Sequence, residues 1–156
     1  MYPQANQKLT YETDDTVYFF SGAFDTLNNF SAHTVKIWNK VFPTVEHAFH
    51  WKKFENTEPE LAAKILKAGS PWSAKKLSRT SENIRTGWRE ARVDIMTDIV
   101  RAKVVQHEDV KQVLLSTGSK KIVENSPVDD FWGCGKDGNG QNNMGKILMK
   151  IREELK

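Results

Sequence analysis

The segment from Glu46 to Phe54 places three reactive side-chain types at helical spacing. If this segment is a helix, Glu46, His50 and Lys53 stand at positions i, i+4 and i+7, so a carboxylate, an imidazole and an amine share one face. Aromatic residues adjoin them in the sequence, and burial among such residues shifts pKa values and makes an amine more nucleophilic. A solvated helix face held by Glu–His–Lys pairing explains the same spacing, so both interpretations stay open.

Metal or thiol chemistry has little support in the sequence. His47 and His50 stand three residues apart, and the H-E-x-x-H order of zinc helices is absent. The only cysteine, Cys134, has no partner for an internal disulfide, and no histidine forms an obvious motif with it. We therefore expect no metal, no bound cofactor and a structural cysteine.

A second cluster of candidate residues is Trp88-Arg89-Glu90-Ala91-Arg92. A tryptophan at helical spacing most often belongs to the core. It could instead be a stacking platform for a planar base, with Arg89 or Arg92 pairing with a phosphate. The sequence does not separate these two roles.

The third cluster is the stretch from Asn125 to Gly145, which is rich in glycine, asparagine and aspartate. Such a composition is typical of a loop whose turns need positive φ. The loop precedes a predicted terminal helix, where backbone N–H groups and the helix N-terminus could hold an anion. Its spacing matches neither the Walker A pattern nor G-x-G-x-x-G, so those two nucleotide-binding folds are not supported.

Length and composition bound the kind of protein that positions these residues. The chain has 156 residues, of which 38% are hydrophobic and 28% are charged, as in one globular domain. Its apolar runs are far shorter than a membrane span, and its start lacks an apolar signal core, so we expect a cytoplasmic protein without a membrane partner. A net charge of +3 argues against a protein whose main task is to coat nucleic acid.

The turn residues, helix-start signals and apolar periodicity predict a mainly helical α+β fold with a small β element. We expect a polar, partly flexible segment over residues 1–16 and one domain over 17–156. Short strands are predicted at 17–21, 34–38 and 121–124, with a turn at Asn39-Lys40 leading into 41–42. Helices are predicted at 45–54 after Thr44, from a capping box at Thr57–Glu60 to Gly69, and from Ser70-Pro71 onward. Three more are predicted from about 83 to 106, at 110–117 and at 147–155.

Taken in order, these clusters resemble the NADAR (YbiA-like) family over residues 17 to 155. The matching segments are Phe19-Phe20 with Leu27-Asn28-Asn29-Phe30, Glu46-His47-Ala48 with Lys53-Phe54, Trp88-Arg89 with Met96 and Lys103, Glu124 to Gly133, and Gly140 to Arg152. Asn28 departs from the serine usual in the family. Asp129 aligns with the family aspartate because it lies three residues before Trp132, although Asp130 stands beside it.

The resemblance implies an enzyme, an N-glycosidase that cleaves the C–N bond between a phosphorylated ribose (ADP-ribose) and a nitrogenous base, such as ADP-ribosylated guanine in nucleic acid. A second branch of the family implies ribosylamino intermediates of riboflavin biosynthesis as substrates. Two other classes stay open, a non-catalytic ADP-ribose or NAD-binding module and an interaction protein that kept the fold. The expected partner is thus an ADP-ribose-containing or ribose-phosphate substrate, with modified nucleic acid as one form of it.

The same resemblance implies the site residues. Glu46 would handle protons, Lys53 would attack the open form of the ribose, and Asp129 would stabilise positive charge or orient ribose hydroxyls. Substrate-binding residues are expected at Phe20, Asn29, His50, Trp88, Arg89, Trp132, Gly133, Asn142 and Gly145. Lys75, Lys76 and Arg79 could contact a nucleic acid, although a solvated helix face is the better explanation of them.

Overall fold

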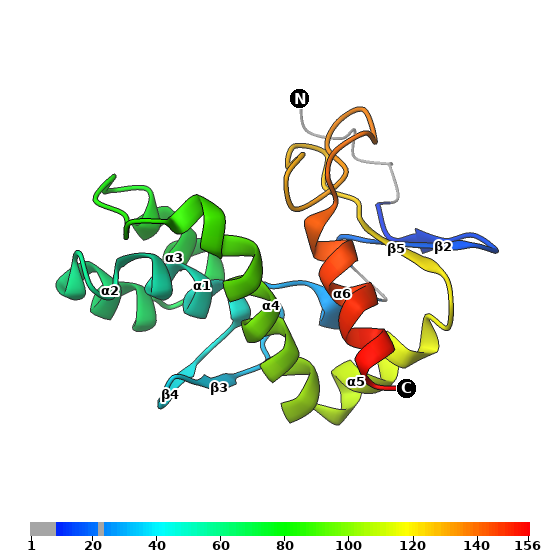
Figure 1. Ribbon diagram of the computed structural model, residues 1–156, viewed down its shortest axis with the longest axis horizontal. Helices are drawn as coiled ribbons and strands as arrows, with labels where there is room; N and C mark the ends of the chain where they lie inside the picture. Colours follow the sequence, from blue (N-terminus) through cyan, green and yellow to red (C-terminus); the bar gives the residue numbers. More distant parts are fainter. Residues whose placement is uncertain (1–8, 22–23) are drawn as a thin grey trace. The chain divides into compact units, whose positions relative to one another are not determined.

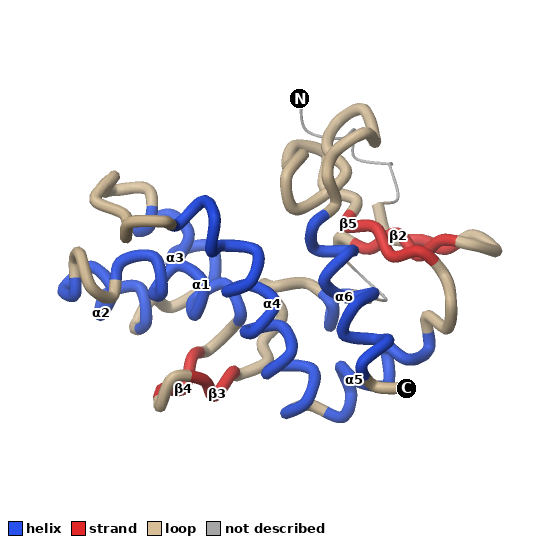
Figure 2. The backbone as a smooth tube through the Cα atoms, viewed as in Figure 1, coloured by secondary structure: helices blue, strands red, loops and turns tan. Residues whose placement is uncertain are grey.

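The computed structural model describes residues 9–21 and 24–156. The chain forms two compact units, a first unit of residues 1–28 and 108–156 and a second unit of residues 29–107. Figure 1 labels most of their helices and strands, and Figure 2 colours the backbone by secondary structure. The second unit is thus continuous in the sequence, whereas the first is made of both ends of the chain.

The first unit is built on a three-stranded sheet in the order β1-β2-β5, in which β2 is antiparallel to β1 and parallel to β5. Its elements are β1 (Tyr11–Glu12), β2 (Thr16–Phe19), the short 3-10 helix η1 (Asp25–Leu27), α5 (Glu108–Ser116), β5 (Lys121–Glu124) and α6 (Asn143–Glu154). Val17 pairs with Ile122 in the register, and both side chains are fully buried. Helix α6 packs against β5 with its apolar face, where Met144, Ile147 and Leu148 are buried. Burial of this face is what holds α6 to the sheet.

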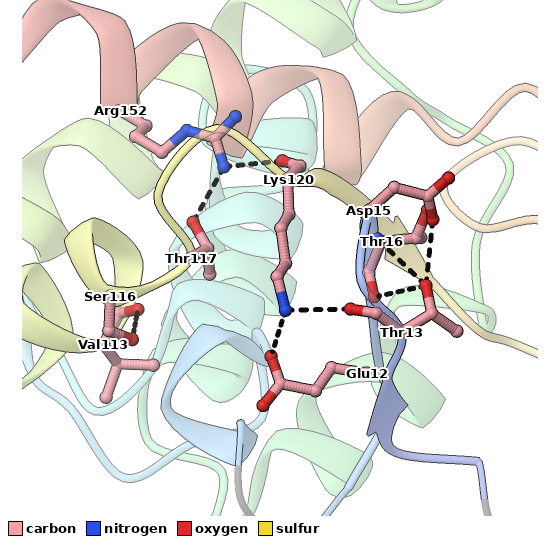
Figure 3. A network of polar contacts seen from close by, with 9 residues as sticks. All are labelled: Glu12, Thr13, Asp15, Thr16, Val113, Ser116, Thr117, Lys120 and Arg152. Carbon is pink, nitrogen blue, oxygen red and sulfur yellow. Dashed lines mark hydrogen bonds and ion pairs between the residues drawn. The ribbon is translucent and has the colours of Figure 1, made fainter.

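A polar network ties the C-terminal end of α6 to the edge of the sheet (Figure 3). The buried Arg152 donates from Nη1 to Thr117 Oγ1 at 2.8 Å and to the Lys120 carbonyl at 2.7 Å. Lys120 Nζ in turn donates to Glu12 Oε2 at 2.9 Å and to the Thr13 carbonyl at 2.8 Å. A buried guanidinium is tolerated only with such partners, so this network fixes the turn that leads into β5.

The second unit is a group of four helices with a β-hairpin. Its elements are β3 (Val35–Ile37), β4 (Lys40–Phe42), α1 (Val45–Phe54), α2 (Pro59–Leu66), α3 (Pro71–Ser78) and α4 (Trp88–Gln106). Helix α1 contacts α2, α3, α4 and β4, and eight of its ten residues are buried. It is therefore the central helix of this unit. Its polar residues Glu46, His47 and His50 are buried with it, whereas Lys52 and Lys53 are half-buried.

Local signals predicted two helix starts correctly. Thr44 caps α1, since its Oγ1 accepts from the backbone N–H of His47 at 3.2 Å, and Ser70 caps α3 by accepting from Ser73 N at 3.0 Å. The predicted capping box at Thr57 was wrong, because α2 begins at Pro59 after Glu58, whose side chain makes no capping bond. Proline at the first helical position sets this start instead.

Among the other boundaries that differ from the prediction, two are set by the backbone conformation. Helix α4 begins at Trp88 rather than near residue 83, because Gly87 is left-handed at φ +74° and the N–H of Arg85 bonds to the Lys53 carbonyl at 3.1 Å. The hairpin turn lies one residue earlier than predicted, with Trp38 and Asn39 both at positive φ, as a two-residue hairpin loop requires. Both differences arise from backbone conformations that side-chain periodicity does not report.

The predicted α+β class is confirmed, with six α-helices and five short strands in residues 9–21 and 24–156. Within the same residues, no helix is long and apolar enough to cross a membrane. The predicted flexible segment over residues 1–16 lies partly outside the described residues, while Tyr11–Glu12 pairs with β2. The single domain over residues 17–156 stays a prediction.

Close packing joins the start of α6 to strand β5. Asn142 accepts from the Glu124 N–H at Oδ1 and donates from Nδ2 to the Ile122 carbonyl, both at 2.9 Å. A Cβ added to Gly145 would overlap that same Ile122 carbonyl and the Asn142 amide. Asn142 and Gly145 therefore let the helix approach the strand.

Replacement of Gly145 by alanine should consequently destabilise the first unit. We expect Gly145→Ala to lower the free energy of unfolding by about 1–3 kcal/mol, because the backbone of α6 must move away from β5. Urea denaturation followed by circular dichroism measures this. Gly69→Ala is the matched control, since nothing lies within 4 Å of its added Cβ, and it should cost nothing measurable. Equal stability of the two variants would contradict the close approach.

Candidate active site

The centre of the candidate site is a buried carboxylate–imidazole pair on α1. Glu46 Oε1 lies 2.8 Å from His50 Nε2, and the two residues are only 8% and 7% exposed. The predicted shared face is thus confirmed for these two residues, and the interpretation as a solvated face was wrong for them. Glu46 also stands in the first turn of α1, where the helix N-terminus stabilises negative charge.

The other ring nitrogen of His50 has an unusual environment. Nδ1 is buried and finds no hydrogen-bond partner among residues 9–21 and 24–156. When Nε2 carries the proton and donates it to Glu46, Nδ1 is left as a buried acceptor. An unsatisfied buried acceptor costs on the order of 1–3 kcal/mol, which a donor group of a ligand or a water could recover.

Asn29 supports the start of α1 from the neighbouring segment. Its carbonyl accepts from the N–H of Glu46 at 3.3 Å, and its Nδ2 donates to the sulfur of Met96 on α4 at 3.6 Å. Asn29 is 8% exposed. It therefore lies directly beside Glu46, as expected of a site residue.

Lys53 carries the third functional group of this face. Burial lowers the pKa of its ammonium from the usual 10.5, and the positive charges of Arg79 and Arg92 lower it further, while the carboxylate of Glu46 opposes both. Burial is the largest of these influences because removal from water penalises the charged form. A lysine with a lowered pKa offers more of the neutral amine that can act as a nucleophile.

Lys53 lines a pocket of about 470 Å³ in the second unit. The pocket collects one carboxylate and four cations, with Trp88 at its wall. Its lining is Lys53, Ile84, Arg85, Gly87, Trp88, Arg89, Glu90 and Arg92. Trp88 is 9% exposed and its ring packs against Phe49 at a centroid distance of 4.9 Å, so it belongs to the core and to the pocket wall at once.

Arg85 and Gly87 are pocket residues that the sequence analysis missed. The prediction placed both inside a helix. In the structure both precede α4: Gly87 is the residue directly before its first turn, and the N–H of Arg85 bonds to the Lys53 carbonyl. The signal that could have found Arg85 is its spacing with Arg89 and Arg92. Three guanidinium groups within eight residues are more than a solvated face needs.

The aspartate of the glycine-rich loop, in the first unit, has a local structural role. Asp129 Oδ1 accepts from the N–H groups of Phe131 at 3.0 Å and Trp132 at 2.8 Å, which closes a turn. The buried Ser126 holds the same turn by accepting from the Asp129 N–H at 3.0 Å. Asp130 is exposed and makes no comparable turn, which favours Asp129 as the ordered carboxylate of the loop.

The remaining predicted residues of the first unit also have structural contacts. Gly133 passes so close to β5 that a Cβ would lie 2.7 Å from the Glu124 carbonyl, and Trp132 is half-buried with its ring edge against Phe131. The carbonyl of the half-buried Phe20 accepts from Asn28 Nδ2 at 2.6 Å. A ligand role for these residues stays a prediction.

The predicted site residues therefore fall into two sets. Asn29, Glu46, His50, Lys53, Trp88 and Arg89 belong to the second unit, and Phe20, Asp129, Trp132, Gly133, Asn142 and Gly145 belong to the first. The structure brings together the set of the second unit, around α1 and the pocket. One site made of both sets stays a prediction.

No group of three His, Cys, Asp or Glu side chains within the described ranges 9–21 and 24–156 could hold a metal ion. His47, the other histidine of α1, is bonded through Nδ1 to Thr44 Oγ1 at 2.8 Å and through Nε2 to the Ala68 carbonyl at 2.9 Å. The buried Cys134 has a pKa raised by burial, and the nearby negative charge of Glu124 adds to this rise. Its thiol is thus held in the protonated, less reactive form.

Comparison with known proteins decides the family. A family model described as the NADAR domain matches residues 10–156. The chain belongs to the NADAR family. This confirms the resemblance found in the order of the motifs.

Several relatives in the NADAR family share most of this chain. An N-glycosidase of Nostoc punctiforme is 37% identical over 145 residues, which cover 90% of this chain and 93% of that protein. The N-glycosidase YbiA of Escherichia coli is 32% identical over 98% of this chain and 97% of its own length. A riboflavin biosynthesis protein of Vibrio vulnificus is 38% identical over 83% of this chain, but only 35% of that protein is covered. The NMR structure of E. coli YbiA matches with a TM-score of 0.83 and covers 99% of this chain and 93% of its own.

The electrostatics of Lys53 give a prediction with a definite sign. In pH-dependent acetylation followed by mass spectrometry, the reactivity midpoint of Lys53 should lie below 10.5 because burial lowers the pKa. Glu46→Gln removes the charge that raises this pKa, so the midpoint should fall further. Arg92→Gln removes a charge that lowers it, so the midpoint should rise. Shifts of the opposite sign in the two variants would contradict the arrangement.

Proposed function

We propose that the protein is an N-glycosidase that hydrolyses the C–N bond between the ribose of ADP-ribose and a nitrogenous base, such as guanine in nucleic acid. The observation that carries this proposal is the pocket of Lys53, whose lining includes Arg85, Arg89 and Arg92 but only one carboxylate, Glu90. One guanidinium group can bind two phosphate oxygens through two parallel N–H···O bonds. Three such groups suit a diphosphate better than a single phosphate.

The relatives support the bond that is cleaved. Two of them, at 37% and 32% identity over nearly their whole lengths, are named N-glycosidases. Hydrolysis of such a bond needs a group that manages protons, a group that stabilises or traps the anomeric carbon, and donors for phosphate. Glu46, Lys53 and the arginines of the pocket supply these three functions in one unit.

Lys53 is proposed as the nucleophile. A proton delivered to the ring oxygen opens the ribose and leaves C1′ double-bonded to the nitrogen of the base. The neutral amine of Lys53 adds to C1′, and the base nitrogen departs with a proton, so that a Schiff base joins Lys53 to the open ribose. Water then hydrolyses this Schiff base, which returns the amine and releases the aldehyde of the sugar.

Glu46 is proposed to carry the protons in these steps. Its buried carboxylate can take a proton from the adding amine and give it to the leaving nitrogen, and His50 orients it through the 2.8 Å contact. Trp88 would stack on the ribose or base and Asn29 would bind ribose or phosphate oxygens. In the first unit, Asp129 would contribute its carboxylate and Trp132 its ring, with the backbone of Gly133, Asn142 and Gly145 near phosphate. These roles rest on the family pattern.

A second candidate substrate is a ribosylamino intermediate of riboflavin biosynthesis. The relative of Vibrio vulnificus named for that pathway favours it, as does a chloroplastic one of Zea mays at 31% identity over 93% of this chain. The chemistry at C1′ would be the same, with one phosphate instead of two. A non-catalytic ADP-ribose-binding module would bind without product release.

A parallel assay distinguishes these functions. Purified protein is given guanine-linked ADP-ribosyl oligonucleotide and a ribosylamino pyrimidine phosphate, and released ADP-ribose or ribose phosphate is measured by mass spectrometry. We expect a higher kcat/KM on the ADP-ribosyl substrate. Arg85→Ala should lower that value about 10-fold or more, chiefly through KM, because a charged phosphate contact is lost. Exclusive turnover of the pyrimidine would overturn the proposal in favour of the second candidate.

The covalent step has its own test. Borohydride added during turnover should reduce the Schiff base and leave a stable mass adduct on Lys53. Lys53→Arg keeps the charge but cannot form this adduct, so it should bind substrate without being trapped. Glu46→Gln should lower kcat by about 100-fold to 10,000-fold while the fold is retained. Absence of an adduct on Lys53 would remove the covalent step, and a fully active Glu46→Gln would remove the proton role.

A further inference from the structure

Helix α3 carries a strip of exposed aromatic and cationic side chains. Trp72, Lys75, Lys76 and Arg79 stand at i, i+3, i+4 and i+7, the spacing of one helix face. Trp72 is 52% exposed, and α3 contains no acidic residue. Trp72 thus presents an aromatic surface to solvent beside cations of its own helix face.

Ring and charge are paired within this strip. The Arg79 guanidinium lies 5.9 Å from the centroid of the Trp72 ring, and Lys75 Nζ lies 5.9 Å from the ring of Phe30, which is itself 37% exposed. Cations at this distance orient an aromatic face and supply charge beside it. We name Phe30, Trp72, Lys75, Lys76 and Arg79 the α3 strip.

Helix α3, which carries most of the strip, packs against α1, the helix of Glu46, His50 and Lys53. The charge of Arg79 is close enough to lower the pKa of Lys53, and Phe30 follows Asn29, whose carbonyl accepts from the Glu46 N–H. The strip is thus linked to Lys53 through Arg79 and to Glu46 through Phe30, and both Lys53 and Glu46 belong to α1.

Charge is strongly concentrated on this unit. Residues 29–107 hold fourteen Lys and Arg against eight Asp and Glu, a net charge of +6, whereas the whole chain has 23 against 20 and a net charge of +3. The remaining residues are therefore net acidic. A polyanion is therefore the class of partner whose charge best complements this unit.

We infer that the α3 strip binds a single strand of nucleic acid, whose bases stack on Trp72 and Phe30 and whose phosphates lie beside Lys75, Lys76 and Arg79. The inference rests on the proposed function and deepens it, since such a strand would carry the ADP-ribosylated base to the pocket. Unpaired bases fit this surface because stacking on an exposed ring needs a free base face. Alternation of rings and cations is the common pattern of proteins that bind single strands.

Binding is tested by fluorescence anisotropy with labelled oligo(dT), oligo(U) and a DNA duplex at several salt concentrations. Trp72→Ala should weaken binding of the single strands about 5-fold to 100-fold, and Trp72→Phe should recover most of it. Lys75→Ala and Lys76→Ala should each lower the slope of log affinity against log salt by about 0.7. Exposed residues outside the strip, Val105→Ala and Lys150→Ala, are the matched controls and should bind as the parent does.

An activity ratio separates this inference from the proposed function. The kcat/KM on an ADP-ribosylated oligonucleotide, divided by that on free ADP-ribosyl guanosine, should fall at least 5-fold in Trp72→Ala. If the parent turns over neither substrate but binding still depends on Trp72, the proposed function fails and the strip is supported. If the parent turns over its substrate and Trp72→Ala binds oligonucleotides as tightly as the parent does, the inference about the α3 strip is overturned. Duplex bound as tightly as single strands overturns the stacking contact.

Discussion

The buried contact between Glu46 and His50 is the constraint on which the site depends. A carboxylate at 8% exposure is stable only with a hydrogen-bond donor, and here it has the His50 ring at 2.8 Å and the N-terminal end of α1. That arrangement requires α1 to be covered by its neighbours α2, α3 and α4, and its first turn to be held by Thr44 and Asn29. The helix is thus central because its polar face must be kept dry.

The same burial sets the chemistry of Lys53. Removal from water and the charges of Arg79 and Arg92 lower the pKa of its amine, and Glu46 only partly offsets them. Between this lowered pKa and 10.5 the unfolded chain binds the extra proton and the folded chain does not, so stability rises with pH through that window. Below the window the folded protein bears the full cost of the charged amine. This cost accords with the nucleophilic role proposed for the neutral amine.

Local sequence signals predicted most of the helices and strands and the shared face of Glu46 and His50. The spacing of Glu46 and His50 and the cap at Thr44 are properties of one helix, and a periodic pattern reports them directly. The start of α4 depends instead on the left-handed Gly87 and on a bond from Arg85 to the backbone of Lys53, thirty-two residues earlier. Arg85 was missed for this reason. Gly145 was noticed, but its close approach to the Ile122 carbonyl is a tertiary fact that the sequence does not contain.

Net charge illustrates how an average can hide a local property. A value of +3 for the whole chain spoke against a protein that coats nucleic acid, while residues 29–107 alone carry +6. Screening at physiological salt confines charge effects to about 8 Å, so a ligand responds to the nearest side chains rather than to the total. Four cations in one pocket and three on the neighbouring face of α3 are therefore compatible with a nearly neutral chain. Such local concentration is what the proposed binding of a phosphorylated ribose requires.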